Sequence, residues 1–420
     1  MKTLNYDIVI IGGGAAGLMA ASLLGDCGAK AALIEPNKLL GKKLRITGKG
    51  RCNVTNNCDL KTFLDNVPQN SRFMYGAFTR FDSAAVMDYF ESLGVPLKTE
   101  RGERVFPVSD RAHDVANALE RHMTKNGIKW LKERALEVKT NEEGAVCEVI
   151  TNESRIKCKA AIICTGGISY PLTGSTGDGY KMAEKLGHSL LTPKASLVPL
   201  ESDDDYCAEM QGFALKNVRL RAYDGKNKCI YDELGEMLFT HFGVSGPLIL
   251  SASAHMRDFE SQKYRLSIDL KPGLDEKKLD ARILRDFEKY ANKEFKNSLN
   301  DLAGRTMIPV LVKLSGIPEE TKVNSITKAQ RQELVKLFKD FPVSISRPRP
   351  VDEAIVTSGG INVKEIDPKT MASKIIPGLY FAGEVIDVDA YTGGFNLQVA
   401  WSTAHSASYS ANDYVMSQGF

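Results

Sequence analysis

The hydrophobic pattern of the first 35 residues predicts a strand, a glycine-rich turn, a helix and a second strand. Residues 8–11 are a continuous apolar run, typical of a parallel strand covered on both faces. Small and apolar residues over 15–24 predict a helix that packs closely on a sheet, and residues 31–34 form the second apolar run. This order predicts a parallel α/β unit.

Further along the chain, the spacing of the hydrophobic residues changes. Helical spacing predicts helices over 83–93 and 110–126, and the polar stretch 97–110 between them predicts a hairpin or loop near a ligand crevice. From residue 127, alternation predicts a three-stranded meander followed by a buried strand at 160–164. From about residue 195, short strands separated by turns indicate a small antiparallel barrel, and residues 273–338 are charged and helical.

Glycines at the first turn indicate a dinucleotide site. They fit G-x-G-x-x-G between a strand and a helix, so the backbone can approach a pyrophosphate at the helix N-terminus. Glu35 ends the second strand near the spacing of roughly 20 residues expected of a ribose-binding acid. The candidate contacts are Gly12, Gly14, Ala15, Ala16, Gly17 and Glu35. The pattern alone does not separate FAD from NAD.

Composition narrows the class of protein. A chain of 420 residues is too long for one ordinary core, and 43% hydrophobic and 25% charged residues are typical of a soluble globular protein. The net charge of +3 gives no reason to expect a nucleic-acid or membrane surface. No apolar run reaches the length of about 18 residues that a spanning helix needs. Eight scattered cysteines without a Cys-x-x-Cys pair fit neither a metal site nor a disulfide framework, so we expect no metal and a cytoplasmic location.

The stretch "GKKLRITGKGRCNVTN" at 41–56 carries five basic residues, three glycines and a cysteine. Its glycine and lysine spacing excludes a Walker A loop, Cys52 and Cys58 do not have zinc spacing, and no aromatic residue is present to stack on RNA bases. Because it leaves the carboxyl end of the second strand, where ligands bind in open α/β sheets, we interpret it as a cofactor loop.

This loop resembles the signature of the aminoacetone oxidase/BaiN-like FAD-dependent oxidoreductases, which have a glutathione-reductase-type FAD fold. The common family pattern is nearer Ser-Gly-Gly-Gly-Arg-Cys-Asn, and Thr47 and Lys49 depart from it. The resemblance implies FAD as cofactor and a loop that runs along the flavin. The residues it suggests near the cofactor are Lys43, Gly50, Arg51, Cys52 and Asn53, and we expect the last three to lie closer to it than the lysines.

The same resemblance implies two further cofactor motifs. The strand "ERALEV" would place the backbone of Ala135 against adenine, and the buried strand "AAIICTGG" would deliver the second motif. In "GLYFAGE" the acid would bind the ribityl chain, and the helix that follows would direct its N-terminus at the flavin N1–C2=O edge. The residues so implied are Ala135, Thr165, Gly166, Gly167, Gly383, Glu384, Gly394, Asn396 and Leu397. Asp178 starts a helix and fits either a cofactor contact or a simple N-terminal cap.

The fold class that we predict is α/β. A Rossmann-type FAD-binding domain over 1–195 and 358–420 surrounds a β-barrel-like substrate domain, 196–272 and 339–357, and a small helical cap, 273–338. No second G-x-G-x-x-G is visible, which argues against a dedicated nicotinamide domain.

The function predicted is that of an FAD-dependent oxidoreductase that transfers hydride through flavin N5. One version is an NAD(P)H-dependent reductase of an activated C=C or carbonyl-conjugated small molecule, with NAD(P)H as a transient co-substrate. The other is an oxygen-dependent oxidase of a small amine such as aminoacetone. A tRNA-binding or tRNA-modifying flavoprotein and a bound-FAD scaffold without turnover are the alternatives of other classes. His241 in "FTHFGVSGPLIL" is the candidate proton donor, with a hinge or core histidine as the alternative. We expect a small-molecule substrate, no nucleic acid and no membrane, and the oligomeric state stays open.

Overall fold

The first unit of the molecule is built on a five-stranded parallel sheet. The computed structural model describes residues 1–418 and divides them into two units, with the first formed by residues up to Ser196 and from Val351. The sheet has the order β21-β11-β2-β3-β7, and all neighbours run parallel. Its strands are β2 (Ile8–Ile11), β3 (Ala31–Ile34), β7 (Lys129–Leu131), β11 (Ala160–Ile163) and β21 (Leu379–Phe381). This arrangement confirms the predicted Rossmann-type α/β fold.

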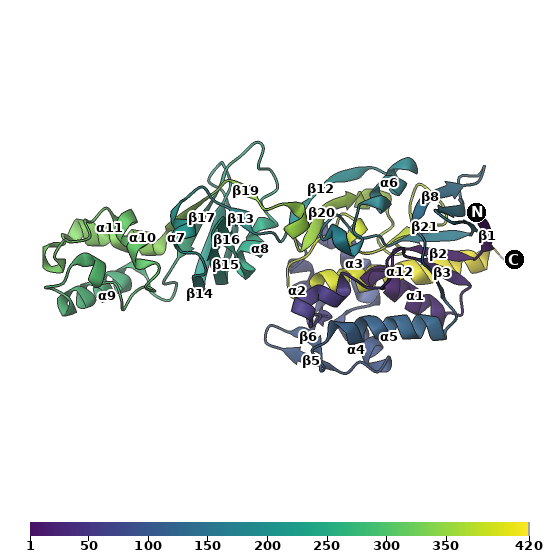
Figure 1. Ribbon diagram of the computed structural model, residues 1–420, viewed down its shortest axis with the longest axis horizontal. Coiled ribbons are helices and arrows are strands. Elements are labelled where there is room, and N and C mark those ends of the chain that lie inside the picture. Colours follow the sequence, from purple (N-terminus) through teal and green to yellow (C-terminus); the bar gives the residue numbers. More distant parts are fainter. Residues whose placement is uncertain (419–420) are drawn as a thin grey trace. The chain divides into compact units, whose positions relative to one another are not determined.

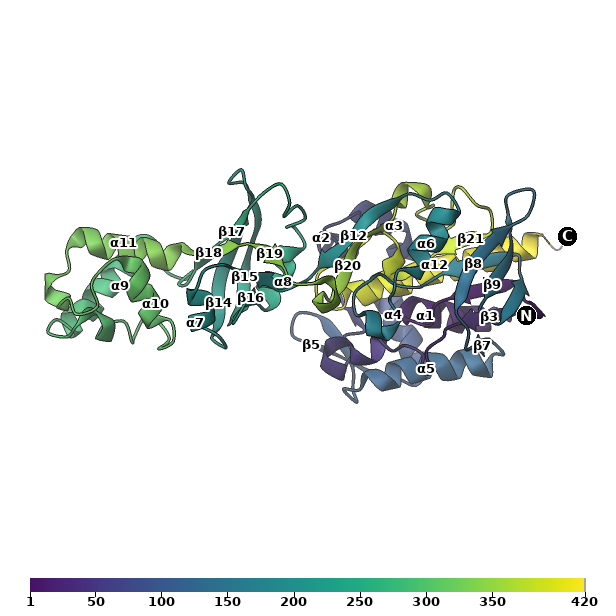
Figure 2. The same cartoon turned by 45° about the horizontal axis from the view of Figure 1, so that its top comes forward.

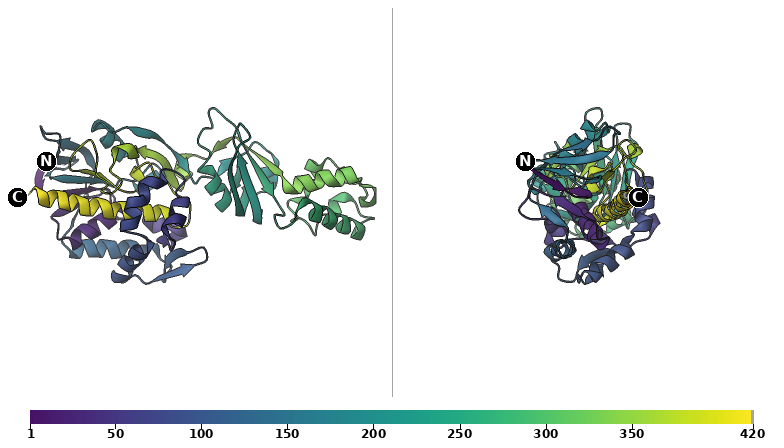
Figure 3. Two further views of the ribbon diagram at one scale, coloured as in Figure 1. Left: turned by 180° about the vertical axis from the view of Figure 1, so that it is seen from behind. Right: turned by 90° about the vertical axis from the view of Figure 1, so that its right-hand side faces the viewer.

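Three helices pack side by side, and two of them lie directly on this sheet. Helix α1 (Ala15–Asp26) contacts both α5 (Ala112–Lys125) and α12 (Phe395–Ser417), and Figure 1 shows the three running side by side. All four residues of β2, β3 and β11 are buried, as continuous apolar runs in parallel strands require. Figure 3 shows α12 as one long helix through the unit. No helix among residues 1–418 is both long and apolar enough to cross a membrane.

Three smaller sheets and several short helices complete this unit. The predicted meander is present as β8 (Ala135–Thr140), β9 (Val146–Thr151) and β10 (Ser154–Lys157), and β1 (Lys2–Asn5) extends it in parallel beside β10 (Figure 2). The stretch 97–110 forms the hairpin β5 (Leu97–Glu100) and β6 (Arg104–Pro107), which pairs with β4 (Thr55–Asn56). The helices are α2 (Leu60–Asp65), α3 (Ser71–Arg80), α4 (Ser83–Ser92) and α6 (Asp178–Lys185).

The second unit, Leu197–Pro350, contains an antiparallel sheet of seven strands. The sheet has the order β18-β17-β14-β15-β16-β13-β19. The strands at its two ends, β18 (Phe341–Ile345) and β19 (Arg347–Pro348), are separated in the chain by Ser346 alone, so one segment completes both edges and the sheet closes like a barrel. The other strands are β13 (Leu200–Glu201), β14 (Ala214–Tyr223), β15 (Cys229–Thr240), β16 (Gly243–Ser245) and β17 (Tyr264–Asp269).

The helical region of the second unit shares one hydrophobic core with this sheet. The helices are α7 (Tyr206–Glu209), α8 (Pro247–Ser253), α9 (Glu276–Lys289), α10 (Ile308–Ser315) and α11 (Lys328–Lys339). Side chains from the strands and from α9, α10 and α11 belong to the same buried cluster. The structure therefore groups residues 273–338 with the barrel, where the sequence suggested a separate cap.

The return to the first unit occurs earlier than the sequence indicated. Strand β20 (Val356–Ile361) pairs antiparallel with β12 (Leu190–Ser196), so the chain re-enters the first unit at Val351 and not at residue 358. This pairing was not visible in the sequence because β12 has a single buried residue and no apolar run.

Candidate cofactor-binding site

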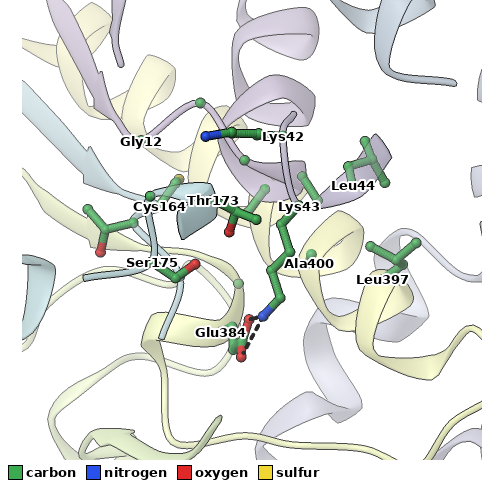
Figure 4. Close-up of a pocket in the computed structure, with 18 of the residues that line it drawn as sticks. Gly12, Lys42, Lys43, Leu44, Cys164, Thr173, Ser175, Glu384, Leu397 and Ala400 are labelled. Atoms are coloured by element: carbon green, nitrogen blue, oxygen red, sulfur yellow. Dashed lines mark hydrogen bonds and ion pairs between the residues drawn. The ribbon is translucent and has the colours of Figure 1, made fainter. Parts of the chain in front are cut away.

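A cavity lies in the first unit at the carboxyl ends of β2, β3, β11 and β21 (Figure 4). It encloses about 1060 Å³ including its open mouth, at the upper end of the range for ligand sites. The lining residues come from the segments after these strands, from the start of β20 and from the start of α12: Gly12–Ala16, Glu35, Asn37, Leu39, Lys42–Leu44, Thr47, Cys164–Gly166, Thr173–Ser175, Ile355, Val356, Ala382–Glu384, Val388, Asn396, Leu397, Val399 and Ala400. This edge of a parallel sheet is where open α/β folds bind nucleotides.

The glycine turn leaves the backbone bare where it faces the cavity. A Cβ built on Gly14 would meet nothing within 4 Å, whereas one on Gly12 would lie 2.6 Å from the Cys164 carbonyl oxygen. Gly17 serves the packing, because its Cβ would lie 1.8 Å from the Gly12 oxygen. Helix α1 starts here without a side-chain cap and without an acidic residue in its first turn. Its first N–H groups and the positive end of its dipole fit a diphosphate.

Glu35 lies beside this turn and lines the same cavity. One carboxylate oxygen accepts from the Gly13 N–H at 2.8 Å, and the other accepts from the Asn37 N–H at 2.9 Å. These bonds fix the side chain, and each carboxylate oxygen keeps a lone pair. Glu35 is therefore placed to accept hydrogen bonds from a ribose.

An ion pair joins two walls of the cavity. Lys43 Nζ lies 2.8 and 3.2 Å from the two carboxylate oxygens of Glu384 (Figure 4). Glu384 also accepts from Ser169 Oγ at 3.1 Å and from the Thr357 N–H at 2.8 Å. Both charged side chains are about one-fifth exposed, so the pair is partly desolvated and charge-assisted.

The N-terminus of α12 forms another part of the lining. Asn396, Leu397, Val399 and Ala400 face the cavity from its first turns. The Asn396 side chain closes the preceding loop, since its Oδ1 accepts from the Ala390 N–H at 2.9 Å and its Nδ2 donates to the Ala390 oxygen. The helix start is thus held in place with no acidic residue in its first turn. Such an end favours negative charge on a ligand.

The structure brings part of the predicted residue set together. Those that line the cavity are Gly12, Gly14, Ala15, Ala16, Glu35, Lys43, Thr165, Gly166, Gly383, Glu384, Asn396 and Leu397. Those outside its lining are Gly17, Gly50, Arg51, Cys52, Asn53, Ala135, Gly167, Asp178 and Gly394. Cofactor contact at each position stays a prediction.

Two of the three residues that we expected closest to the cofactor have other surroundings. Arg51 pairs with Glu100 and Asp110 and stacks on Phe106, with its guanidinium 4.1 Å from the ring centroid. Cys52 is fully buried, and burial raises the pKa of its thiol to about 12. Both therefore hold the loop to the β5–β6 hairpin and the core, while Lys42 and Lys43 reach the cavity.

The remaining positions outside the lining have different surroundings. Gly167 and Gly394 permit close packing, since a Cβ would lie 2.3 Å from Thr357 Oγ1 and 2.4 Å from the Thr55 backbone, respectively. Asp178 pairs with Arg134, and Ala135 begins β8. Gly50 has a φ of 84°. The Oδ1 atom of Asn53 is buried without a hydrogen-bond partner among residues 1–418, so one acceptor there is unused.

His241 lies in the second unit, in the turn between β15 and β16. It is exposed, and its ring contacts Phe242 edge-on at 5.0 Å. A role as proton donor stays a prediction.

Several lining residues had no motif that could identify them. Asn37, Thr173, Ser175, Ile355, Val356 and Val388 reach the cavity from segments whose course depends on tertiary packing. Lys42 and Thr47 stand inside the loop noted above, but nothing in the sequence separates them from their neighbours. No cluster of three or more metal-ligating side chains occurs in the described part of the chain.

Fold and cavity together define an α/β protein with a Rossmann-type dinucleotide site. The chain belongs to the HI0933-like protein Rossmann domain family, whose model matches residues 6–410. It is a flavin-dependent oxidoreductase of the FAD-binding Rossmann class, in agreement with the family resemblance of the sequence. The bare glycine turn, Glu35 and the uncapped helix starts fit FAD.

Curated relatives match nearly the whole chain. A "Ribosomal RNA dihydrouridine synthase" of Escherichia coli is 31% identical over 405 residues, 95% of this chain and 96% of the relative. A protein of the same name from Haemophilus influenzae is 30% identical and covers 96% of this chain and 97% of its own length. A "3-dehydro-bile acid delta(4,6)-reductase" of Clostridium scindens is 29% identical over 96% of this chain and 98% of the relative.

Solved structures share the fold at low sequence identity. The open conformation of a flavocytochrome c3 fumarate reductase gives a TM-score of 0.53 at 15% identity, covering 98% of this chain and 79% of the other. A 3-ketosteroid-Δ4-(5α)-dehydrogenase from Rhodococcus jostii gives 0.52 at 15% identity, with 97% of each chain covered. These likenesses support the FAD-binding fold.

Proposed function

We propose that this protein uses FAD to reduce a C=C bond conjugated to a carbonyl group. The names of the relatives support this reaction class. A dihydrouridine synthase saturates the uracil C=C beside a ring carbonyl, and a 3-dehydro-bile acid Δ4,6-reductase saturates C=C bonds conjugated with the 3-oxo group. One reaction type unites both substrates, in which hydride adds to the β-carbon and a proton to the α-carbon.

The observation that carries the proposal is the convergence on one cavity of the glycine turn, the Lys43–Glu384 pair and the start of α12. The N-terminus of α1 would bind the diphosphate, and Glu35 would hold the adenosine ribose. The N-terminus of α12 would favour negative charge on the flavin. Bound FAD would supply the hydride acceptor and donor at N5.

Reduced nicotinamide is the electron donor that we propose. The overall reaction would be NAD(P)H + H⁺ + conjugated C=C → NAD(P)⁺ + saturated product. The sequence has one G-x-G-x-x-G, so the nicotinamide would bind transiently at the flavin and not in a domain of its own.

Anaerobic mixing of the FAD-loaded protein with NADH, NADPH or aminoacetone tests the donor. We expect loss of the oxidised flavin absorbance with one of the nicotinamides and none with the amine. Bleaching by the amine alone, followed by peroxide formation in air, would instead identify an amine oxidase.

A second candidate substrate is a uridine in ribosomal RNA. Two relatives at 31% and 30% identity over at least 95% of this chain carry that activity in their names. From the sequence we expected no nucleic acid, because the net charge is small and the loop lacks aromatic residues. The names of the relatives make RNA a substrate to test directly.

The two substrate classes are separable in one assay. The reduced protein is offered unmodified ribosomal RNA or a conjugated steroid ketone, and the products are analysed by mass spectrometry. A gain of two hydrogens in a uridine would identify RNA as the substrate. A gain of two hydrogens in the ketone alone would identify a small molecule as the substrate.

A further inference from the structure

Two loops that form opposite walls of the cavity are tied to each other directly. The loop after β3 contributes Asn37 and Lys42–Leu44 to the lining, and the segment after β11 contributes Thr165, Gly166 and Thr173–Ser175. Strands β3 and β11 flank β2 on either side, so a ligand at the glycine turn would lie between these loops.

Three side chains of the first loop donate across to the second. Asn37 Nδ2 donates to the Thr173 carbonyl at 3.0 Å, and Lys42 Nζ donates to the Leu172 carbonyl at 2.6 Å. Lys43 Nζ donates to Ser169 Oγ at 2.7 Å. The acceptors span five consecutive residues, 169–173, so the bonds fasten one short segment.

Apart from Ser169, which is buried and bonded to Glu384, the fastened segment has few other contacts that hold it. The 3-10 turn at Pro171–Thr173 contains no buried residue, and the Leu172 side chain is 88% exposed. Its backbone reverses through positive φ values at both ends, 53° at Tyr170 and 112° at Gly174. A segment with few buried contacts can open locally at small cost.

The bond from Asn37 depends on a glycine opposite it. A Cβ on Gly174 would lie 2.7 Å from Asn37 Nδ2, so only glycine allows this approach. Asn37 is itself oriented by Glu35, whose carboxylate accepts from the Asn37 N–H. Asn37 thus connects the segment at Thr173 to Glu35, the acid that would bind the ribose.

We propose that Asn37 and Lys42 close the segment 169–174 over bound FAD as a clasp that sets how fast the cofactor leaves. The proposal rests on FAD as the ligand of this cavity. Entry and exit of the dinucleotide would require the two donors to release the Thr173 and Leu172 carbonyls. The clasp therefore acts on retention and leaves the flavin environment unchanged.

The test compares FAD release from the wild type, Asn37→Ala, Lys42→Met and the double variant. Loaded protein is diluted, and free flavin is followed by its fluorescence. We expect each single variant to release FAD several-fold faster and the double variant roughly tenfold faster, with the bound-flavin absorption spectrum unchanged. Lys49→Met is the matched control, because Lys49 is exposed on the same loop and lies outside the lining.

Chymotrypsin supplies a second readout that does not involve turnover. We expect FAD to protect the wild type from cleavage after Leu172 and to give the double variant little protection. Unchanged release from the fully loaded double variant would overturn the clasp, as would acceleration by Lys42→Met without any by Asn37→Ala, since that pattern indicates a direct phosphate contact of Lys42. A wild type that takes up no FAD would contradict the cofactor assignment itself.

Discussion

At the scale of single residues, Glu384 connects three segments that are distant in the sequence. Its carboxylate accepts from Lys43 in the loop after β3, from Ser169 after β11 and from the Thr357 N–H in β20. Each of these hydrogen bonds is charge-assisted, because its acceptor is a carboxylate. The shape of the cavity near Gly383 therefore depends on one negative charge.

Glu384→Gln tests this dependence. The amide has nearly the volume of the carboxylate, but it removes the negative charge opposite Lys43. It also places an NH₂ group next to side chains and a backbone N–H that themselves donate. We expect the Kd for FAD to rise about tenfold, measured by titrating apo-protein into FAD and following fluorescence.

Glu148→Gln is the matched comparison, since Glu148 pairs with Arg155 outside the cavity lining. We expect its FAD affinity to stay within about twofold of the wild type. Equal losses in the two variants would show that the Lys43–Glu384 pair has no special part in binding.

Side chains inside the loop 41–56 mark the limit of sequence reasoning at this scale. The sequence does not distinguish the basic residues Lys42, Lys43, Arg45 and Arg51 from one another. The groups that they contact lie far away in the chain. Arg45 is buried against Asn117 and Glu120 of α5, and Arg51 pairs with the hairpin. The sequence located the cofactor loop, while tertiary contacts decide which cation reaches the cavity.

At the scale of elements, α12 positions the cavity wall through buried polar side chains. Gln398 Nε2 donates to the Phe81 carbonyl at 2.9 Å, and Trp401 Nε1 donates to the Val54 carbonyl at 2.8 Å. Ser402 Oγ also donates to the Phe81 carbonyl. These bonds satisfy backbone groups in loops and fix the register of the helix.

His405 of α12 gives this element a pH dependence. Its ring stacks on Phe81 with centroids 4.6 Å apart, and burial, with a smaller effect of Arg80, lowers its pKa from 6.5 to about 4. The unfolded chain therefore binds a proton that the folded chain does not, and stability must fall as the pH drops from about 6.5 to about 4.

The variant His405→Phe keeps an aromatic ring on Phe81 and removes the titration. We expect its Tm to fall less than that of the wild type over this pH window, although carboxylates titrate in both. Tryptophan fluorescence reports the transition of the first unit, since Trp130 and Trp401 both lie in it. Parallel Tm curves would show that His405 contributes nothing to the pH dependence.

At the scale of the whole molecule, the chain consists of two units, each with its own hydrophobic core. The sequence predicted β2, α1, β3, the meander and α12, because their patterns are local and their turns are marked by glycine. It missed the pairing of β12 with β20 and the shared core of barrel and helices. Both depend on contacts between segments that are distant in the chain, as at Ser196 and Val356.

The central claim is that reduced flavin on this protein passes hydride to a C=C bond conjugated to a carbonyl. Its most direct test starts from protein whose FAD has been reduced chemically without oxygen, so that the identity of the natural donor does not matter. The reduced protein is mixed with a conjugated ketone or with unmodified ribosomal RNA, and flavin absorbance is recorded. Our account predicts that one of these acceptors restores the oxidised spectrum and yields one saturated product per flavin. A flavin that stays reduced with both acceptors, and is reoxidised by oxygen alone, would contradict it.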